Sequence, residues 1–249
     1  MTLPTEKSAQ TLSPDKVKAL LYGPPKIGKS TFASQINPDH TLFIPTEPGL
    51  GALEVFEAPV SDWAGFRAVG GELAKDAKQF QVVVIDTVDE LYRMCSDHVC
   101  AELGIKHPSD ADYGKGWSAV RDEFALRVGK LTGLGLGVWF ISHAEDREVK
   151  KKVGSKTVTQ PSLTGQGRKF LAGFVDFIFL ATWEGDEGDE RVLRTQGAEH
   201  HEAGGRVPEG AAPLPDPLPL DAAVLRKAMA DSLKPKAAKK TEQKKEGEK

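Results

Sequence analysis

The sequence has few cysteines, few aromatic side chains and no apolar segment long enough to cross a membrane. Cys95 and Cys100 are the only cysteines among 249 residues, which excludes a disulfide-rich scaffold, and their spacing fits no common zinc-binding pattern. The amino-terminal MTLPTEKSAQTLSPDK has no apolar core of the kind that signal peptides need. We therefore expect a cytoplasmic protein that has no membrane partner.

An excess of charge of either sign is also absent. The chain has 33 Lys and Arg against 36 Asp and Glu, a net charge of −3, so any contact with nucleic acid must come from a local basic patch. We expect a flexible amino terminus (1–15), a core (16–206), a proline-rich linker (207–220), a short amphipathic helix (221–232) and a disordered Lys/Glu-rich tail (233–249).

The most informative segment is GPPKIGKS at 23–30. It matches the pattern G-x-x-x-x-G-K-[ST], in which backbone N–H groups face phosphate oxygens, the lysine neutralises phosphate charge and the hydroxyl binds Mg²⁺. An apolar run at 17–22 precedes it, and 31–36 should begin a helix whose positive end faces the same anion. The segment predicts a site for ATP and Mg²⁺. Its candidate binding residues are Gly23, Pro24, Pro25, Lys26, Ile27, Gly28, Lys29, Ser30 and Thr31.

Short apolar runs alternate with segments of helical periodicity, as in an α/β fold with a mostly parallel central sheet flanked by helices. Ser61 is expected to cap the second helix. Two β-like arms around Gly154 predict a hairpin or a mobile loop, and antiparallel strands are expected at the carboxyl-terminal side. The predicted strands are 17–22, 42–44, 82–85, 138–141, 174–182 and 191–195, and the predicted helices are 31–36, 61–78, 88–103 and 117–131.

Polar residues follow two of these strands. Asp86 ends the run 82–85, where a carboxylate can hold Mg²⁺. The alternative is that Asp86 or Thr87 simply caps the next helix. Many P-loop ATPases have a glutamate at the position of Thr87, so the predicted catalytic carboxylate is instead Glu47, at the end of another strand, with Glu90 as the fallback. An ordinary solvated carboxylate is the alternative for Glu47.

The strand 138–141 leads into Ser142 and His143, and His143 can contact the γ-phosphate. A histidine on the loop surface is the alternative. A basic segment follows directly, which we interpret as a polyanion-binding surface switched by the nucleotide; a charged exposed hairpin is the alternative. Arg206 is a candidate for the cation that completes a neighbouring subunit's site, although a plain surface arginine fits equally. The basic candidates are Arg147, Lys150, Lys151, Lys152 and Lys156.

Over residues 17–206 the chain resembles the RecA-like P-loop ATPases encoded by bacteriophages, because a set of motifs occurs in the same order. The motifs are GPPKIGKST, Glu47, VVVID with Thr87, DYGKGW at 112–117, ISH at 141–143, PSLTGQGRKFL at 161–171 and FVDFIFL at 174–180. The resemblance implies Lys29 and Ser30 on phosphate and Mg²⁺, Asp86 on Mg²⁺, Glu47 as catalytic glutamate and His143 as polar sensor. It also implies that the segment 147–160 is a single-stranded-DNA-binding loop.

For function, the resemblance implies a DNA-stimulated ATPase of phage recombination, annealing or repair, located in the host cytoplasm. It further implies a homo-oligomer, ring or filament, and a single-strand-binding or replication protein as a partner. One alternative is an ATP-dependent switch or loader adaptor that binds a replication or packaging protein in place of DNA. A small-molecule kinase ranks lower, since the sequence offers no evident lid or acceptor pocket.

Overall fold

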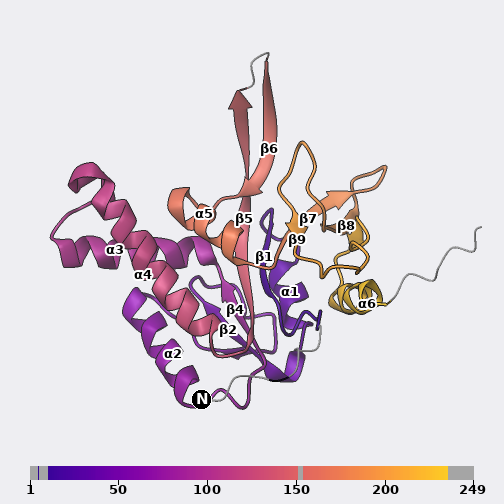
Figure 1. The fold of residues 1–249 in the computed structure, drawn as a ribbon, viewed down its shortest axis with the longest axis horizontal. Helices are drawn as coiled ribbons and strands as arrows, with labels where there is room; N and C mark the ends of the chain where they lie inside the picture. The colour runs from indigo at the N-terminus through magenta and orange to yellow at the C-terminus, as the bar shows by residue number, and fades with distance from the viewer. Residues whose placement is uncertain (1–4, 6–10, 151–153, 235–249) are drawn as a thin grey trace, which may run out of the picture.

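A mixed, mostly parallel β-sheet forms the middle layer of the molecule, and helices cover both of its faces (Figure 1). The computed structural model describes residue 5, residues 11–150 and residues 154–234. The elements are β1 (Lys18–Gly23), α1 (Lys29–Ser34), η1 (Pro38–His40), β2 (Thr41–Pro45), β3 (Phe56–Glu57), α2 (Trp63–Lys75), β4 (Val82–Asp86), α3 (Val88–Leu103), η2 (Pro108–Asp110), η3 (Asp112–Gly114), α4 (Lys115–Thr132), β5 (Gly137–Lys150), β6 (Ser155–Pro161), α5 (Gly165–Phe174), β7 (Phe177–Glu184), β8 (Glu190–Arg194), β9 (Gly204–Gly205), β10 (Leu218–Pro219) and α6 (Ala222–Ser232).

The strand order is β10-β8-β7-β1-β5-β4-β2-β3, with β6 paired to β5 and β9 paired to β7. The strands from β7 to β3 in this order pair in parallel, whereas β8 and β10 are antiparallel to their neighbours. The predicted α/β class and the antiparallel strands at the carboxyl-terminal side are therefore present. Because β1 lies between β5 and β7, the loop that follows β1 has sheet on both sides.

Side chains of the central strands alternate between two apolar clusters, as the period-two geometry of a strand requires. In β4, Val82 and Val84 join one cluster, while Val83 and Ile85 join the other. The first cluster lies under α1 and α6, and the second lies under α2, α3, α4 and α5. Both faces of the sheet are thus buried, which explains why the runs predicted as strands are continuously apolar.

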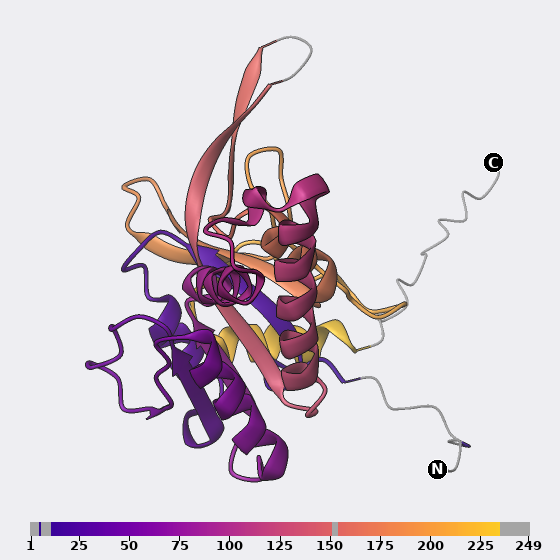
Figure 2. The ribbon, with the colours of Figure 1, turned by 90° about the vertical axis from the view of Figure 1, so that its left-hand side faces the viewer.

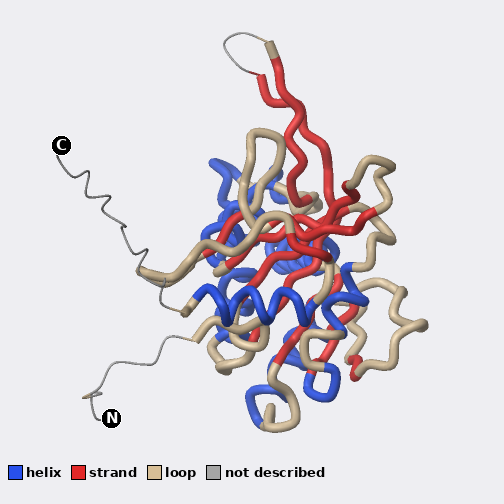
Figure 3. Tube along the Cα trace, turned by 90° about the vertical axis from the view of Figure 1, so that its right-hand side faces the viewer, coloured by secondary structure: helices blue, strands red, loops and turns tan. Residues whose placement is uncertain are grey.

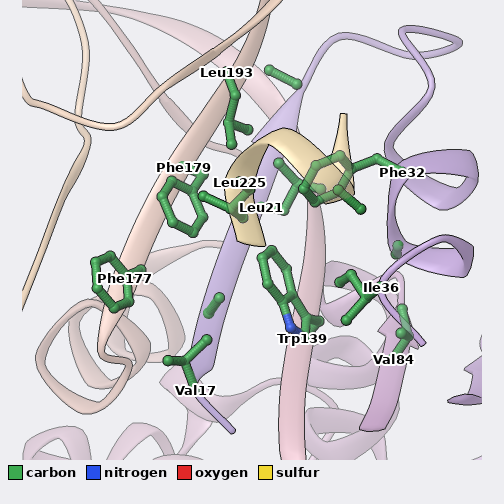
Figure 4. Close-up of a cluster of buried hydrophobic side chains, with 14 of the residues drawn as sticks. Val17, Leu21, Phe32, Ile36, Val84, Trp139, Phe177, Phe179, Leu193 and Leu225 are labelled. Atoms are coloured by element: carbon green, nitrogen blue, oxygen red, sulfur yellow. The ribbon is translucent and has the colours of Figure 1, made fainter. Parts of the chain in front are cut away.

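The carboxyl-terminal helix α6 is part of the first cluster. Figure 3 shows the helix lying across the strands of the sheet. Leu225 and Met229 are fully buried, and Leu225 lies near Trp139 and Phe179 of the strands (Figure 4). The proline-rich segment 207–220, expected as a linker, also packs here, since Leu218 is buried and β10 pairs with β8. Helix α1 has only six residues, so much of this sheet face is left for the segment 207–220 and α6 to cover.

An ion pair holds α6 against the start of the core. Arg226 donates from Nη1 to Asp15 Oδ2 at 2.5 Å and from Nη2 to Asp15 Oδ1 at 2.8 Å. Burial alone would raise the pKa of Asp15, but the hydrogen bonds and charge of Arg226 outweigh it and leave that pKa lowered. The Arg226 guanidinium also donates to the carbonyl oxygen of Ile36 after α1. The pair therefore connects three segments that are distant in sequence.

Strand β5 extends far beyond the sheet. Val138–His143 pair with β1, and the continuation Ala144–Lys150 pairs with β6 to form a two-stranded arm that stands away from the body (Figures 1 and 2). The expected hairpin around Gly154 is this arm. Lys151 and Lys152 lie outside the described residues, as do most of the expected amino-terminal segment and the expected tail from residue 235 onward.

Several local expectations were wrong at element ends. Asp62, not Ser61, caps α2, because its carboxylate accepts from the Gly65 N–H at 2.7 Å. Phe174, expected in a strand, ends α5, since its apolar neighbours continue a helical face. None of the helices in the described part of the chain combines the length and the apolar character needed to cross a bilayer.

Candidate functional site

The loop 23–30 joins the end of β1 to α1. A Cβ on Gly23 would lie 2.3 Å from the carbonyl oxygen of Ala181 in β7, so only glycine fits between these strands. Gly28 has φ of 106°, a conformation that L side chains rarely adopt, directly before the first residue of α1. The Lys29 ammonium donates to the carbonyl oxygens of Gly23 and Pro24 at 2.8 and 3.0 Å. The lysine is thereby held across the mouth of its own loop.

Ser30 and Asp86 meet beside this loop. The Ser30 hydroxyl donates to Asp86 Oδ2 at 2.6 Å. Burial raises the pKa of Asp86, an effect partly offset by the Ser30 hydrogen bond and the charge of Lys29. Burial likewise lowers the pKa of Lys29, against the attraction of Asp86 and Asp89. The fold thus holds a cation, a carboxylate and a hydroxyl together in a largely desolvated position.

Glu47 lies on the adjacent strand end, and threonines orient it. The Thr87 hydroxyl donates to Glu47 Oε1 at 2.9 Å. Thr87 is itself fixed to Thr46, because its backbone N–H donates to Thr46 Oγ1 at 2.9 Å and its carbonyl oxygen accepts from the same hydroxyl at 3.0 Å. Parallel pairing of β2 with β4 explains the meeting, since it places Pro45 opposite Asp86. Thr87 also caps α3, as its side chain accepts from the Glu90 N–H.

His143 lies where β5 leaves the sheet, and Asp89 fixes the backbone around it. Asp89 accepts from the Ser142 hydroxyl at 2.9 Å, from the Ser162 hydroxyl at 2.7 Å and from the His143 N–H at 3.3 Å. The His143 Nδ1 atom is buried and has no hydrogen-bond partner among the described residues. The His143 side chain lines the cavity, and its Nδ1 atom is free to form a hydrogen bond with a ligand there.

These groups border one cavity of about 620 Å³, a size in the range of small-molecule sites. Of the predicted site residues, the structure places Pro25, Lys26, Gly28, Lys29, Ser30, Thr31, Glu47, Asp86 and His143 in its lining. Gly23, Pro24 and Ile27 belong to the same loop but do not line the cavity, and Ile27 is fully buried in the first cluster. Glu90, the fallback for Glu47, instead pairs with Arg93 on α3.

The donor set fits a magnesium ion bound together with a nucleotide. No group of three or more His, Cys, Asp or Glu side chains within residues 11–150 and 154–234 is arranged to hold a metal ion, so the protein would supply few ligands itself. Mg²⁺ is commonly held by one or two protein groups plus substrate phosphates and water. Ser30 and Asp86, already in contact at the cavity wall, are the residues that would hold it.

Three of the five predicted DNA-binding residues fall within the described part of the arm, away from the cavity at the loop 23–30. Arg147, Lys150 and Lys156 line a groove of about 570 Å³ between the arm and the segment 198–202. Acidic side chains share the described part of the arm in equal number with basic ones, the acids being Glu145, Asp146 and Glu148. In the full sequence, the segment 144–161 has five basic residues against these three acids.

Arg206 lies at the other end of the sheet from the loop 23–30. It donates to the Gly173 carbonyl oxygen at 2.5 Å and approaches Asp176 Oδ1 at 3.8 Å, while Asp176 accepts from the Lys18 N–H at the start of β1. A role in its own chain's cavity does not fit this placement.

Cys95 and Cys100 are both buried and free, and burial raises the pKa of Cys100.

Asp89, Thr87 and Thr46 were not predicted to support the site. An acid in the first turn of a helix is common, so Asp89 alone carries no signal. The nearest sequence cue is its spacing of three residues from Asp86, but its partner Ser162 is 73 residues away and only the fold brings the two together.

Comparison with known proteins gives one family. A family model described as an AAA domain matches residues 15–207, from just before β1 to just after β9. The matched segment includes the whole lining of the cavity and the arm, while β10 and α6 lie beyond it. A search of the curated proteins gives no match.

Proposed function

The chain belongs to the AAA-domain family of P-loop ATPases, and we propose that it binds ATP with Mg²⁺ at the loop 23–31 and hydrolyses it. The observation that carries this proposal is the 2.6 Å hydrogen bond between Ser30 and Asp86 inside the cavity that Lys29 also lines. A hydroxyl, a carboxylate and an ammonium at the mouth of a glycine-containing loop are the groups that phosphoryl transfer requires.

Each residue has a defined part in hydrolysis. Lys29 neutralises charge on the phosphates, and its amino group exchanges the loop carbonyls for phosphate oxygens. Bound Mg²⁺ supplies further neutralisation of the phosphate charge. Glu47 accepts a proton from the attacking water, and the Thr87 hydroxyl on Oε1 holds the carboxylate in one orientation. His143 donates to the terminal phosphate from the end of β5.

We further propose that this is a RecA-like ATPase acting on single-stranded DNA in recombination, annealing or repair, as a ring or filament. Two features support this. The catalytic carboxylate comes from the end of β2, not from the residue after Asp86. The strand that carries His143 continues without interruption into the arm, so His143 lies on the same strand as the DNA-binding candidates Arg147 and Lys150.

The test is ATP hydrolysis with and without single-stranded DNA, with particle mass measured in the same solutions. We expect stimulation by DNA, and loss of that stimulation in the combined variant Arg147→Ala, Lys150→Ala and Lys156→Ala with basal hydrolysis retained. A matched control removes three lysines far from the arm: Lys75→Ala, Lys78→Ala and Lys130→Ala. The DNA proposal fails if DNA neither binds nor stimulates. Lys29→Ala should abolish hydrolysis whether the partner is DNA or a protein, so this variant cannot distinguish the two.

An ATP-dependent switch for a protein partner is the second candidate. The acidic side chains Glu145, Asp146 and Glu148 on the described arm favour it, because carboxylates beside the basic residues repel a polyanion but suit a protein surface of mixed charge. In that case the arm variant should lose capture of a replication protein, while single-stranded DNA has no effect on hydrolysis by the unaltered chain.

A further inference from the structure

The functional groups described above act on the phosphates and Mg²⁺, so the nucleoside end of the nucleotide needs contacts of its own. Asp86, Glu47 and His143 come from β4, β2 and β5, which all lie on one side of β1 in the sheet. The terminal phosphate therefore faces that side of the loop 23–30. A nucleotide bound with this polarity must extend its α-phosphate, ribose and base toward the opposite side of β1, where β7 and β8 lie (Figure 1).

On that side, Arg191 of β8 reaches the phosphate-binding loop. A Cβ placed on Gly28 would lie 3.0 Å from Arg191 Nη1 and 4.0 Å from Leu220 Cδ2. Leu220 is fixed beside the arginine, since its N–H donates to the Arg191 carbonyl oxygen at 3.0 Å. Within the described parts of the chain, the Arg191 guanidinium has neither an ion pair nor a hydrogen bond. Its donors are thus available to a ligand held on the loop.

An exposed tryptophan lies next to this arginine. Trp183 of β7 pairs directly with Arg191 in the antiparallel register, and directly opposed residues project from the same face of a sheet. Ala181, two residues earlier on that face, contacts the start of the loop, since a Cβ on Gly23 would lie 3.1 Å from Ala181 Cβ. The Trp183 side chain is 46% exposed, whereas most large apolar side chains of the sheet are buried. A flat ring therefore stands open just beyond the loop.

We propose that Trp183 and Arg191 form the nucleoside subsite of this ATPase: Trp183 stacks on the base, and Arg191 binds the α-phosphate. This inference rests on the proposed function, because it assumes that a nucleotide occupies the loop 23–30. Neither residue touches the groups that act on the terminal phosphate, so both are binding residues that set affinity for the nucleotide and leave the chemistry unchanged.

Binding of ADP and of inorganic tripolyphosphate, both with Mg²⁺, separates the two contacts. Trp183→Ala should weaken ADP binding by about tenfold or more, the usual loss for a stacked base, and leave tripolyphosphate binding unchanged. Trp183→Phe keeps a ring and should restore most ADP affinity. Arg191→Ala should weaken both ligands, because it removes a phosphate contact. Tyr113→Ala, at a fully exposed ring on a distant 3₁₀ turn, is the matched control and should change neither.

A second readout is tryptophan fluorescence. Emission from the unaltered chain should be quenched by ADP, and the quenching should be lost in Trp183→Phe although ADP still binds. Equal loss of ADP and tripolyphosphate in Trp183→Ala, or no loss of either, overturns the subsite while leaving the ATPase intact. If the unaltered chain binds no nucleotide, the proposed function and the subsite fall together.

Discussion

Ser30 and Asp86 are joined by a 2.6 Å hydrogen bond although they are 56 residues apart in the chain. The bond connects the phosphate-binding loop to the end of β4, across the intervening strand β5. The two groups that would share a magnesium ion are thus placed by the sheet and not by any local motif.

The first prediction concerns this pair. Ser30→Ala removes one side of the magnesium position and should raise the Mg²⁺ concentration for half-maximal hydrolysis by about 10- to 100-fold, with ATP saturating. Ser34→Ala, one turn later on α1, is the control and should leave the magnesium dependence unchanged. An identical magnesium titration for Ser30→Ala and the unaltered chain would show that the hydroxyl is not a ligand.

Glu47 and Thr87 give the second prediction. Glu47→Gln keeps the hydrogen bond from Thr87 but cannot take a proton, so kcat should fall by about 10²- to 10⁴-fold while ADP affinity is retained. Thr87→Val frees the carboxylate and should lower kcat less, with KM unchanged. Steady-state hydrolysis over a range of ATP concentrations gives kcat and KM for both variants. If Glu90→Gln, and not Glu47→Gln, stops turnover, the fallback carboxylate is the base.

The third prediction concerns α6. Leu225 is fully buried, so Leu225→Ala should reduce the free energy of unfolding by about 2–5 kcal/mol. Lys227→Ala, exposed on the same helix, should change it by less than about 0.5 kcal/mol. Urea unfolding followed by circular dichroism gives both values. Equal stability of the two variants would mean that α6 does not contribute to the core in solution.

The pH dependence of stability is the fourth prediction. The pKa of Asp15 is lowered from 3.8 in the folded chain by Arg226, so the unfolded chain binds the proton more readily. The stabilisation is therefore fully present above the unfolded pKa and is lost as pH falls through the folded one. The stability difference between the unaltered chain and Asp15→Asn should be constant above about pH 5 and shrink below about pH 4. A difference that grows on acidification would contradict the assignment.

The sequence predicted the fold class and the strand ends because both depend on short-range patterns. Runs such as 82–85 are apolar on both faces, and the polar residue that ends each run must lie at the same sheet edge as the loop after β1. This is why Glu47, Asp86 and His143 could be named together before the structure placed them in one cavity.

The rest depends on pairings that no local pattern encodes. Prolines at 213–219 predict an extended linker. In the structure, this segment and α6 instead pack on the part of the sheet that α1 leaves uncovered. Trp183 and Arg191 carry no motif, since their importance comes from the antiparallel register of β7 with β8. Asp89 similarly gains its role from Ser162, which reaches it only after the chain has passed through the arm.

Strand β5 runs without a break from His143 to Lys150 at the end of the described arm. From His143 to Lys150 the strand advances seven residues, or about 23 Å at the usual rise per residue. A tilt of about 5° at His143 would displace the far end by about 2 Å, enough to break or form hydrogen bonds there. Under the proposed function, a small movement beside the terminal phosphate would therefore be magnified at the end of the arm, where the proposed partner would bind.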